Sequence, residues 1–343
     1  MDQSTALMQR ALDAAWLGPE ADPNPRVGCV ITDPSGTVVG VGHHRGAGSP
    51  HAEVDALAAA GDRAHGGTAH VTLEPCSHSG RTGPCTEALF AAGIAKVVYA
   101  VADPDPIAGG GAGWLAERGV EVSADVLSAD AEAVNASWLH ARRTGRPWVV
   151  WKAASTLDGR TAADDGSSRW ITGEAARADV HALRARCGAV VVGTGTAITD
   201  DPRLTVRTAD GSTAARQPLR VVVGNRALPT GAALADESAP TLHLRTHDPD
   251  EVLASLHERG VHRVLLEGGA TLAAAFLRAG LVDEVVLYLA PAVLGSGAPL
   301  VADLGVHTIT DALRLHPSDV TVIGQDLRIT ARPQSTPVPR KRS

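Results

Sequence analysis

Short apolar runs typical of strands alternate with helical patterns along most of this 343-residue chain, and this alternation constrains the fold more strongly than any other feature. In the first half, a helix is expected over residues 5–16, and strands over 27–32 and 37–42 are joined by the turn residues DPSG. Further helices and strands are expected, the helices over 51–61, 85–93 and 130–143 and the strands over 69–73, 96–103 and 120–126. Because helices that separate strands cover the faces of a sheet, the first half is predicted to be α/β.

The second half shows the same rhythm. Its expected helices and strands are the helices 174–187, 250–260 and 270–280 and the strands 148–154, 189–196, 219–225, 241–245, 263–269 and 284–291. A strand that is followed by a helix and then by another strand normally pairs with that strand in parallel. The second half is therefore also predicted to be α/β, with a largely parallel sheet.

The segment RRTGRP, residues 142–147, is the best candidate for a boundary between two domains. Three arginines, a glycine and a proline follow a predicted helix at this point. The length agrees, since domains average about 150 residues and 343 residues therefore favour two of them. We expect domains over residues 1–145 and 146–333, followed by a Pro-rich basic tail, residues 334–343, that should be disordered.

The charge and the aromatic content of the chain argue against nucleic acid as a partner. Lys and Arg number 31 against 38 Asp and Glu, which gives a formal net charge of −7, and aromatic residues make up 3%. A nucleic-acid binder needs a basic surface and, for single strands, aromatic faces on which bases stack. The composition does not exclude a local basic pocket for one phosphate.

Two segments bear on location. The N-terminus carries Asp2 and has helical spacing, so it is not a basic and then apolar secretory signal, and we expect a cytoplasmic protein. Residues 285–302 are uncharged and about long enough to span a bilayer, but Pro291 and three further Gly and Pro residues interrupt them. No membrane partner is expected.

Four cysteines are too few for a disulfide scaffold in a chain of this length. Cys29 and Cys187 lie in apolar surroundings, where packing is the simpler explanation. Cys76 follows a Pro at the end of a predicted strand, Cys85 follows a Pro at the start of a predicted helix, and His51 lies upstream of both. One imidazole and two thiolates on the ends of elements are typical of a catalytic zinc site that keeps its fourth position for water.

Glu53 is the expected proton carrier between the attacking water and the leaving amine, without itself binding the metal. Ser49 is the expected N-cap of the helix that carries His51 and Glu53, with Pro50 at its first position. Residues two positions apart on a regular helix point to nearly opposite sides. His51 and Glu53 can therefore share a site only if the first turn is placed to allow it.

These residues resemble the signature of zinc-dependent nucleobase and nucleoside deaminases, His-x-Glu followed by Pro-Cys-x-x-Cys. Eight residues, SHSGRTGP, separate Cys76 from Cys85 where the signature has two, which argues against a simple cytidine deaminase. The stretches HAEVDAL and VTLEPCSHSGRTGPC closely resemble the deaminase half of the bifunctional riboflavin-biosynthesis deaminase/reductases. That family also carries stretches similar to PNPRVGCVI at 23–31 and DPDPIAGGG at 103–111.

The resemblance implies a cytidine-deaminase-like α/β/α layer domain that hydrolytically removes the 2-amino group of a diaminopyrimidinone with a 5-phosphoribosylamino chain. Asn24 and His44 match family positions near the pyrimidine. In the inserted loop, Arg81 can neutralise the phosphate, a hypothesis that rests on its charge and on the neighbouring glycines. A solvated loop arginine is the alternative for Arg81.

The second half lacks a dinucleotide-binding fingerprint, because AVVVGTGTAITDDP has no third glycine and no long helix after the strand. Gly268 and Gly269, between a strand and a helix, are the better candidates for a diphosphate site. The runs KAASTLDGR, SRWIT, GTGTAITDDPRLTVR, LLEGGATLA and APAVLG resemble the reductase half of the same family, which has a dihydrofolate-reductase-like fold and uses NADPH.

This resemblance implies residue roles in the reduction of the ribosyl group to ribityl. The residues implied to contact NADPH are Ala154, Trp170, Thr196, Asp200, Gly269, Ala270, Thr271 and Leu272. Those implied to contact the substrate are Ser168, Arg184, Leu204, Arg207 and Glu267. Arg184 and Arg207 are suited to grip a phosphate, and Lys152 or Asp200 could supply a proton.

The sequence leaves three alternatives. One is a zinc deaminase of another nucleobase with a non-catalytic C-terminal domain, the second is a nucleic-acid editing enzyme, and the third is a binding protein with a structural zinc. The composition disfavours the second, and a carboxylate beside a three-ligand zinc disfavours the third. The resemblance also implies a homo-oligomer, of a size that the sequence does not fix.

Overall fold

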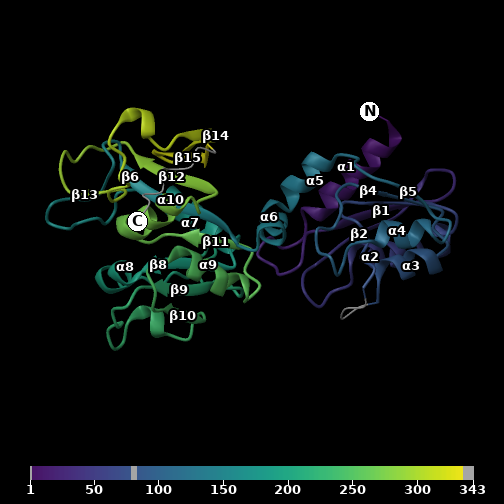
Figure 1. The fold of residues 1–343 in the computed structure, drawn as a ribbon, viewed down its shortest axis with the longest axis horizontal. Coiled ribbons are helices and arrows are strands. Elements are labelled where there is room, and N and C mark those ends of the chain that lie inside the picture. Colours follow the sequence, from purple (N-terminus) through teal and green to yellow (C-terminus); the bar gives the residue numbers. More distant parts are fainter. Residues whose placement is uncertain (1, 79–82, 335–343) are drawn as a thin grey trace. The chain divides into compact units, whose positions relative to one another are not determined.

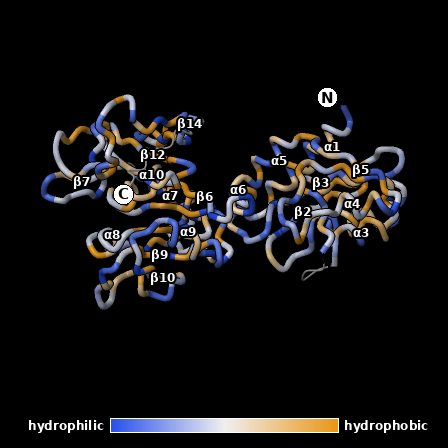
Figure 2. Tube along the Cα trace, viewed as in Figure 1, coloured by the Kyte–Doolittle hydropathy of each residue, from blue (hydrophilic) through white to orange (hydrophobic). Residues whose placement is uncertain are grey.

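The computed structural model describes residues 2–78 and 83–334. The chain divides into two compact units, Met1–Gly145 and Arg146–Ser343, each built around its own sheet (Figure 1). Figure 2 shows that the strands inside each unit are the most hydrophobic segments, whereas most connecting loops are hydrophilic. Of the helices in the described residues, none is long and apolar enough to cross a membrane.

The first unit contains a five-stranded sheet with the order β2-β1-β3-β4-β5. Its strands are β1 (Gly28–Thr32), β2 (Val38–His43), β3 (Thr68–Val71), β4 (Lys96–Tyr99) and β5 (Glu121–Ser123). The predicted hairpin is confirmed, since β1 pairs antiparallel with β2. β1 is also antiparallel to β3, while β3, β4 and β5 run parallel. The carboxyl ends of β3 and β4 therefore meet at one edge of the sheet.

Helices cover both faces of this sheet and make it the middle of three layers. One face packs against α2 (Ala52–Ala60), α3 (Cys85–Ala91) and α4 (Gly111–Ala116). The other packs against α1 (Gln3–Ala15), α5 (Ser128–Val134) and α6 (Ala136–Thr144). A short 3-10 helix, η1 (Gly61–Ala64), follows α2. The expected α/β/α layer architecture is confirmed.

The sequence predicts one helix over 130–143, and this prediction is wrong, because the segment forms the two helices α5 and α6. They meet at Asn135, whose side chain accepts a hydrogen bond from the Arg26 backbone N–H and donates one to its carbonyl, both at 2.8 Å. A helical pattern of apolar residues does not reveal such a side-chain bond to a residue far away in the sequence, which ends one helix and begins the next.

The second unit contains an eight-stranded sheet with the order β10-β9-β8-β11-β6-β12-β15-β14. Its strands are β6 (Trp148–Thr156), β8 (Ala189–Gly193), β9 (Leu219–Val223), β10 (Thr241–Leu244), β11 (Arg263–Leu266), β12 (Glu284–Ala290), β14 (Leu315–Ile323) and β15 (Asp326–Pro333). The six strands from β10 to β12 are parallel, as the sequence predicts. β15 and β14 extend the sheet antiparallel and were not predicted.

Two apolar cores lie on the opposite faces of this sheet. One contains side chains of α9 (Pro249–His257) and α10 (Ala270–Ala279). The other contains side chains of α7 (Glu174–Ala185) and α8 (Thr194–Thr199). The remaining described elements are the two-stranded sheet of β7 (Arg160–Ala162) and β13 (Ala298–Pro299) and the 3-10 helices η2 (Ala233–Ala235) and η3 (Ile309–Asp311). The tail 334–343 was expected to be disordered. Its first residue, Gln334, donates its backbone N–H to the Arg314 carbonyl, and residues 335–343 lie outside the described part.

Candidate functional site

The three predicted zinc ligands lie together at one edge of the first sheet. His51 precedes α2, Cys76 lies in the loop after β3, and Cys85 is the first residue of α3. The Nδ1 atom of His51 lies 3.1 Å from the Cys85 sulfur and 3.6 Å from the Cys76 sulfur. All three ligand atoms lie within 4.8 Å of one another, and among the described residues this is the only such cluster.

A zinc ion fits these three side chains. In tetrahedral coordination, Zn–S and Zn–N bonds place nitrogen and sulfur ligands about 3.5 Å apart, which the two observed separations bracket. Hydrogen bonds from the Cys85 thiol and from His51 also lower the pKa of Cys76 to about 4. The thiolate is the form of cysteine that binds metal.

The helix start explains how His51 and Glu53 can share one site. Ser49 is not the N-cap, because its hydroxyl donates to the Gly46 carbonyl at 2.7 Å, and α2 begins only at Ala52. His51 is itself the N-cap, with an extended backbone at φ −69° and ψ 161°. The rule for residues two positions apart on a regular helix therefore does not apply, because His51 lies outside the helix and Glu53 within its first turn.

α2 is held close to the sheet by two glycines of β2. A Cβ on Gly40 would lie 2.2 Å from the Ala56 carbonyl oxygen, and a Cβ on Gly42 would lie 2.4 Å from that of Ala52. Only residues without a side chain permit this approach of helix backbone to strand. The approach fixes the level of the first turn of α2 and with it the position of Glu53.

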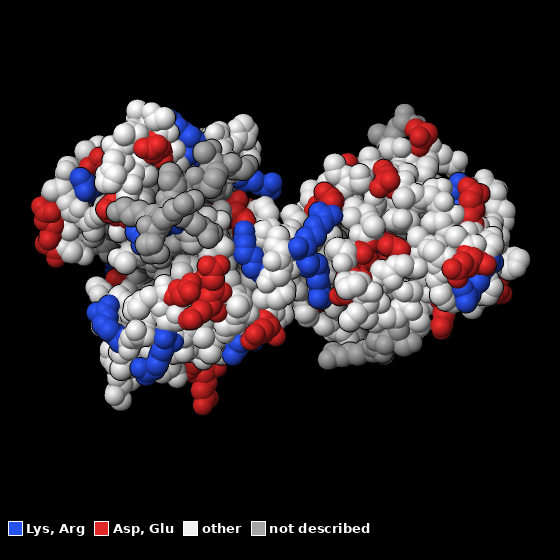
Figure 3. Space-filling model, viewed as in Figure 1, with Lys and Arg blue, Asp and Glu red and all other residues white. Residues whose placement is uncertain are grey.

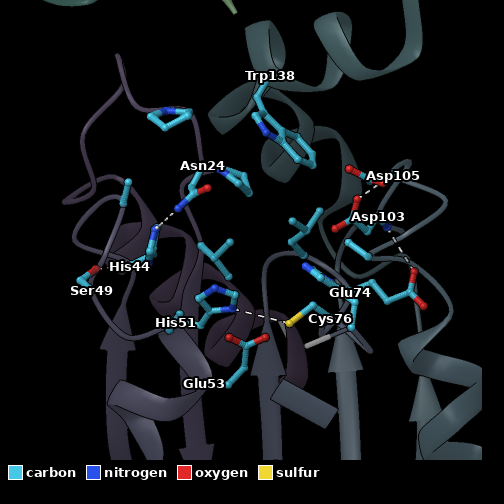
Figure 4. A pocket seen from close by; sticks show the side chains of 18 of the residues that line it. Asn24, His44, Ser49, His51, Glu53, Glu74, Cys76, Asp103, Asp105 and Trp138 are labelled. Atoms are coloured by element: carbon cyan, nitrogen blue, oxygen red, sulfur yellow. Dashed lines mark hydrogen bonds between the residues drawn. The ribbon is translucent and has the colours of Figure 1, made fainter. Parts of the chain in front are cut away.

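Glu53 is buried, with 3% of its surface exposed. Burial raises the pKa of its carboxyl, because the charged form loses its hydration. The carboxyl lies on the floor of the pocket, below the His51 ring (Figure 4). It is thus placed to exchange protons with a molecule held at the cluster.

The cluster forms one end of a pocket of about 580 Å³. Asn24 and His44 line its wall, and the His44 Nε2 lies 3.1 Å from the Asn24 amide nitrogen. The His44 Nδ1 lies 3.0 Å from the Pro50 carbonyl, which can only accept, so Nε2 of the neutral ring accepts from Asn24. This bond turns the Asn24 amide oxygen into the pocket (Figure 4).

The opposite wall of the pocket is acidic, and sequence reasoning missed its residues. Glu74 accepts hydrogen bonds from the backbone N–H groups of Asp103 and Ala112 at 3.2 and 2.9 Å. Burial raises the pKa of Asp103 to about 6. Arg142, which lies 3.4 Å from Asp105, is the one Arg or Lys among the described lining residues. The stretch at 103–111, quoted above only for its resemblance, was the available signal.

Three further predictions concern Cys29, Cys187 and Arg81. Cys29 and Cys187 are 0% and 2% exposed and belong to apolar cores, as expected of packing residues. None of the four cysteines is bridged. Arg81 lies outside the described residues.

A second group of predicted residues meets where β11 ends, beside the middle of β6 in the second sheet. Lys152 on β6 lies level with Glu267, because Trp151 pairs with Leu266 in the parallel strands β6 and β11 and each residue is one position further along its chain. The alternation of side chains places Lys152 on the face of Val150, the face that α7 covers. Burial lowers the pKa of Lys152, while the charge of Glu267 opposes that effect.

Arg184 does not present the free bidentate edge that a phosphate grip requires. Its Nε and Nη2 donate to the two Glu267 oxygens at 2.5 and 2.9 Å, and Nη1 donates to the Thr205 carbonyl at 3.1 Å. In this structure Glu267 occupies that edge, and the expectation that Arg184 grips phosphate stays a prediction. The Arg184 guanidinium fixes the Glu267 carboxylate beside Lys152.

Leu204 and Arg207 lie in a loop that packs on α7. His181 holds this loop, since its Nδ1 lies 3.1 Å from the Thr205 carbonyl oxygen and 3.3 Å from the Arg207 backbone nitrogen. The Arg207 side chain is exposed. Sequence reasoning had assigned His181 no role, and its position three residues before Arg184 on α7 was the available signal.

Of the predicted cofactor residues, Thr196 and the residues 269–272 meet at the turn between β11 and α10. The Gly269 N–H donates to the Thr196 hydroxyl at 3.0 Å. A Cβ on Gly268 would lie 2.7 Å from the Gly193 nitrogen, so the turn needs glycine to lie against the end of β8. Gly269 is the N-cap of α10 and makes no side-chain cap bond, which leaves a helix N-terminus for a diphosphate.

The segment with Ser168 and Trp170 reaches Asp200 through Arg169, whose Nη2 donates to the Asp200 carbonyl at 2.9 Å. Trp170 is 70% exposed, and the Arg177 guanidinium lies 4.4 Å from its ring centroid. Burial raises the pKa of Asp200. Ala154 lies two residues beyond Lys152 on β6, level with Tyr288.

Two family models match the chain. The cytidine and deoxycytidylate deaminase zinc-binding region matches residues 1–101, and the RibD C-terminal domain matches residues 147–329. The riboflavin biosynthesis protein RibD of Mycobacterium tuberculosis is 52% identical over 312 residues, which cover 90% of this chain and 91% of that protein. The RibD protein of Escherichia coli is 40% identical, with 95% and 98% covered.

Solved structures agree with these matches. Acinetobacter baumannii RibD superimposes with a TM-score of 0.91 at 40% identity and covers 97% of this chain and 99% of its own. A Thermotoga maritima protein described as a diaminohydroxyphosphoribosylaminopyrimidine deaminase/5-amino-6-(5-phosphoribosylamino)uracil reductase gives a TM-score of 0.83 at 30% identity, with the same coverage. The likeness thus extends over both units.

Proposed function

The chain belongs to the RibD family of bifunctional riboflavin-biosynthesis deaminase/reductases, and from this membership we propose the substrates, the cofactors and the residue roles of its two activities. The first unit, residues 1–145, deaminates 2,5-diamino-6-(5-phosphoribosylamino)pyrimidin-4-one. The second, residues 146–333, reduces the product, 5-amino-6-(5-phosphoribosylamino)uracil, with NADPH. The order follows from the chemistry, because the uracil is the product of the first step and the substrate of the second.

The deaminase role rests on one observation above all, the convergence of His51, Cys76 and Cys85 over the buried carboxyl of Glu53. Bound zinc supplies an activated water molecule at neutral pH. Glu53 takes a proton from the attacking water and delivers it to the 2-amino group. Water replaces that group, the ring gains a carbonyl, and ammonia leaves.

The pyrimidine lies against the wall formed by Asn24 and His44. The Asn24 amide oxygen accepts a hydrogen bond from an N–H of the ring, and His44 keeps the amide in this orientation. Within the inserted loop, Arg81 neutralises the phosphate. A rise in the KM of Arg81→Ala for the phosphorylated substrate supports this role, and an unchanged KM contradicts it.

In the reductase unit, bound NADPH supplies a hydride for C1′ of the ribosylamino group. The turn of Gly269 to Leu272 would hold its diphosphate, and the Thr196 hydroxyl accepts the first N–H of that turn. Ala154, Trp170 and Asp200 contact the rest of the cofactor. Ser168, Arg184, Leu204, Arg207 and Glu267 contact the substrate, with Arg207 on its phosphate, and Arg184 also holds Glu267 in place.

Lys152 donates the proton that accompanies ring opening, because its ammonium lies beside Glu267 among the substrate residues. Asp200 is the alternative donor, and the pH dependence of the reaction distinguishes the two. We also propose a cytoplasmic location and a homo-oligomeric state. Light scattering of the purified protein tests the oligomeric state.

The reductase assignment has a direct test that does not involve the deaminase site. Purified enzyme is given 5-amino-6-(5-phosphoribosylamino)uracil and NADPH, and the loss of NADPH absorbance is followed. Oxidation that depends on the uracil supports the assignment. Absence of oxidation contradicts it and leaves the deaminase assignment standing.

A further inference from the structure

The strand order of the second unit gives a bound dinucleotide a direction. Glu267 directly follows β11, Lys152 lies next to it near the middle of β6, and the glycine turn after β11 lies against the end of β8. The next strands outward from β8 are β9 and then β10, each about 4.8 Å further along the sheet. Parallel strands end at one sheet edge, so a dinucleotide with its nicotinamide at β6 and its diphosphate at the turn extends its adenosine toward β9 and β10.

Two arginines meet at this corner of the sheet. Arg226 follows β9 by three residues, and its Nη2 lies 3.2 Å from the position of a Cβ on Gly195, in the first turn of α8. Arg245 directly follows β10, and its Nη1 donates to the Asn225 carbonyl at 3.3 Å. Both side chains are exposed. Arg and Lys side chains lie over α8 and β10 in the lower part of this unit in Figure 3.

The corner also brings an imidazole close to the same backbone. The Cε1 atom of His247 lies 3.5 Å from the position of a Cβ on Gly224, and the His243 Nε2 lies 2.8 Å from the Gly224 carbonyl oxygen. Leu244 pairs with Val223, so the two strands end level with each other. The ends of β9 and β10 are therefore one contiguous surface, next to the turn that holds the diphosphate.

The charges at this corner suit an anion. In Rossmann domains a carboxylate holds the ribose 2′-hydroxyl of NADH, whereas an arginine accommodates the 2′-phosphate of NADPH, and the same rule of charge applies to a different fold. Here the strand runs into Gly224, Asn225 and Arg226, with no carboxylate among them. The neighbouring carboxylates form hydrogen bonds within residues 246–251. Asp248 caps α9 by accepting from the Asp250 N–H, and Glu251 accepts from the Thr246 hydroxyl.

We infer that Arg226 and Arg245 bind the 2′-phosphate of NADPH and thereby select NADPH over NADH. This inference rests on the proposed reductase function and adds the residues that determine its cofactor specificity. Each guanidinium offers paired N–H groups to the phosphate oxygens, the geometry in which arginine binds phosphate most strongly.

Equilibrium titrations of the full chain with NADPH and with NADH, followed by calorimetry, test the inference without a measurement of turnover. We expect wild type to prefer NADPH. Arg226→Ala should weaken NADPH binding about tenfold or more, the loss expected of one charge-assisted contact, and leave NADH binding unchanged. The double variant with Arg245→Ala should remove the preference altogether. Adenosine 2′,5′-bisphosphate, which carries the same 2′-phosphate, should lose affinity in parallel.

Arg259→Ala is the matched control, because Arg259 is exposed just after α9 and bonds to the Ser255 carbonyl and hydroxyl. It should bind both nucleotides as wild type does. If Arg226→Ala and the double variant keep the full preference for NADPH, the inference is wrong and the proposed function stands. If wild type binds neither nucleotide, the proposed reductase function fails and the inference fails with it.

Discussion

Glu53 and Lys152 are the residues on which the two proposed chemistries depend, and each is embedded in a charged cluster. Glu53 lies beneath His51 with almost no contact to solvent. Lys152 lies next to a carboxylate that a guanidinium holds with two hydrogen bonds. In both cases the neighbours fix the position of the reacting group, so removal of the group and removal of its neighbours should have separable effects.

Glu53→Gln should reduce ammonia release by about 10² to 10⁴-fold, because the amide cannot carry the proton from the attacking water to the amine. Zinc content, measured by atomic absorption, and the reductase rate should remain at the wild-type level. Cys76→Ser is the contrasting variant, since it should lose zinc and deamination together. Loss of zinc from Glu53→Gln would contradict the role of Glu53 as a proton carrier that does not bind the metal.

The pH dependence of the reductase should identify the proton donor. Burial lowers the pKa of Lys152, so its ammonium loses its proton at a lower pH than an ordinary lysine. If Lys152 is the donor, the rate is constant at low pH and falls as pH rises through this lowered pKa. If Asp200 is the donor, the rate also falls as pH rises, but it does so already in the acidic range, where pH passes the raised pKa of the Asp200 carboxyl.

Lys152→Arg supplies the control for this profile, because arginine keeps the positive charge and does not titrate in the measurable range. The fall in rate at basic pH should disappear in the variant together with most of the activity. A wild-type profile that is unchanged in Lys152→Arg would show that the lysine is not the titrating group.

At the scale of elements, the position of α2 decides whether the metal ligands and the proton carrier meet. Gly42→Ala would place a methyl group 2.4 Å from the Ala52 carbonyl oxygen. The helix must shift, at about 1 to 3 kcal/mol of unfolding free energy, the usual range for overpacking. We expect lower stability in urea denaturation and weaker zinc binding in competition with a chelator.

Gly113→Ala is the matched control, because Gly113 lies in α4 with no atom within 4 Å of the position of its Cβ. That variant should match wild type in zinc affinity. If Gly42→Ala also keeps wild-type zinc affinity and stability, the glycines of β2 do not set the position of the site.

Periodicity was enough to predict most elements and the α/β class of both halves, because their apolar faces pack against a sheet in the way the spacing implies, whereas the α/β/α layers were predicted from the family resemblance. It failed where a single side chain or a distant strand decides the structure. Asn135 ends a helix through bonds to Arg26, and β14 has mostly exposed residues without an alternating pattern. The zinc site was predictable because its ligands lie near Pro residues at element ends. Asp103 in the zinc pocket and His181 in the second unit have no such local marker, and only the fold brings them to their sites.

At the scale of the whole molecule, the two chemistries should be separable because their residues belong to different units. All three zinc ligands lie in Met1–Gly145, and the residues around Lys152 lie in the second unit. Removal of zinc with a chelator should abolish deamination and leave reduction of the deaminated uracil at the wild-type rate. Ammonia release and NADPH oxidation measure the two separately, and a parallel loss of both would mean that the second unit also depends on the metal.

The central claim is that this one chain catalyses two consecutive steps, and product identification tests it most directly. Zinc-loaded full-length enzyme is given the diaminopyrimidinone substrate, with or without NADPH, and the products are identified by mass spectrometry. Without NADPH we predict the aminouracil with its ribosyl group intact, and with NADPH the corresponding ribityl compound. A product that keeps its 2-amino group under both conditions, or a ribosyl group that survives NADPH, would contradict the account.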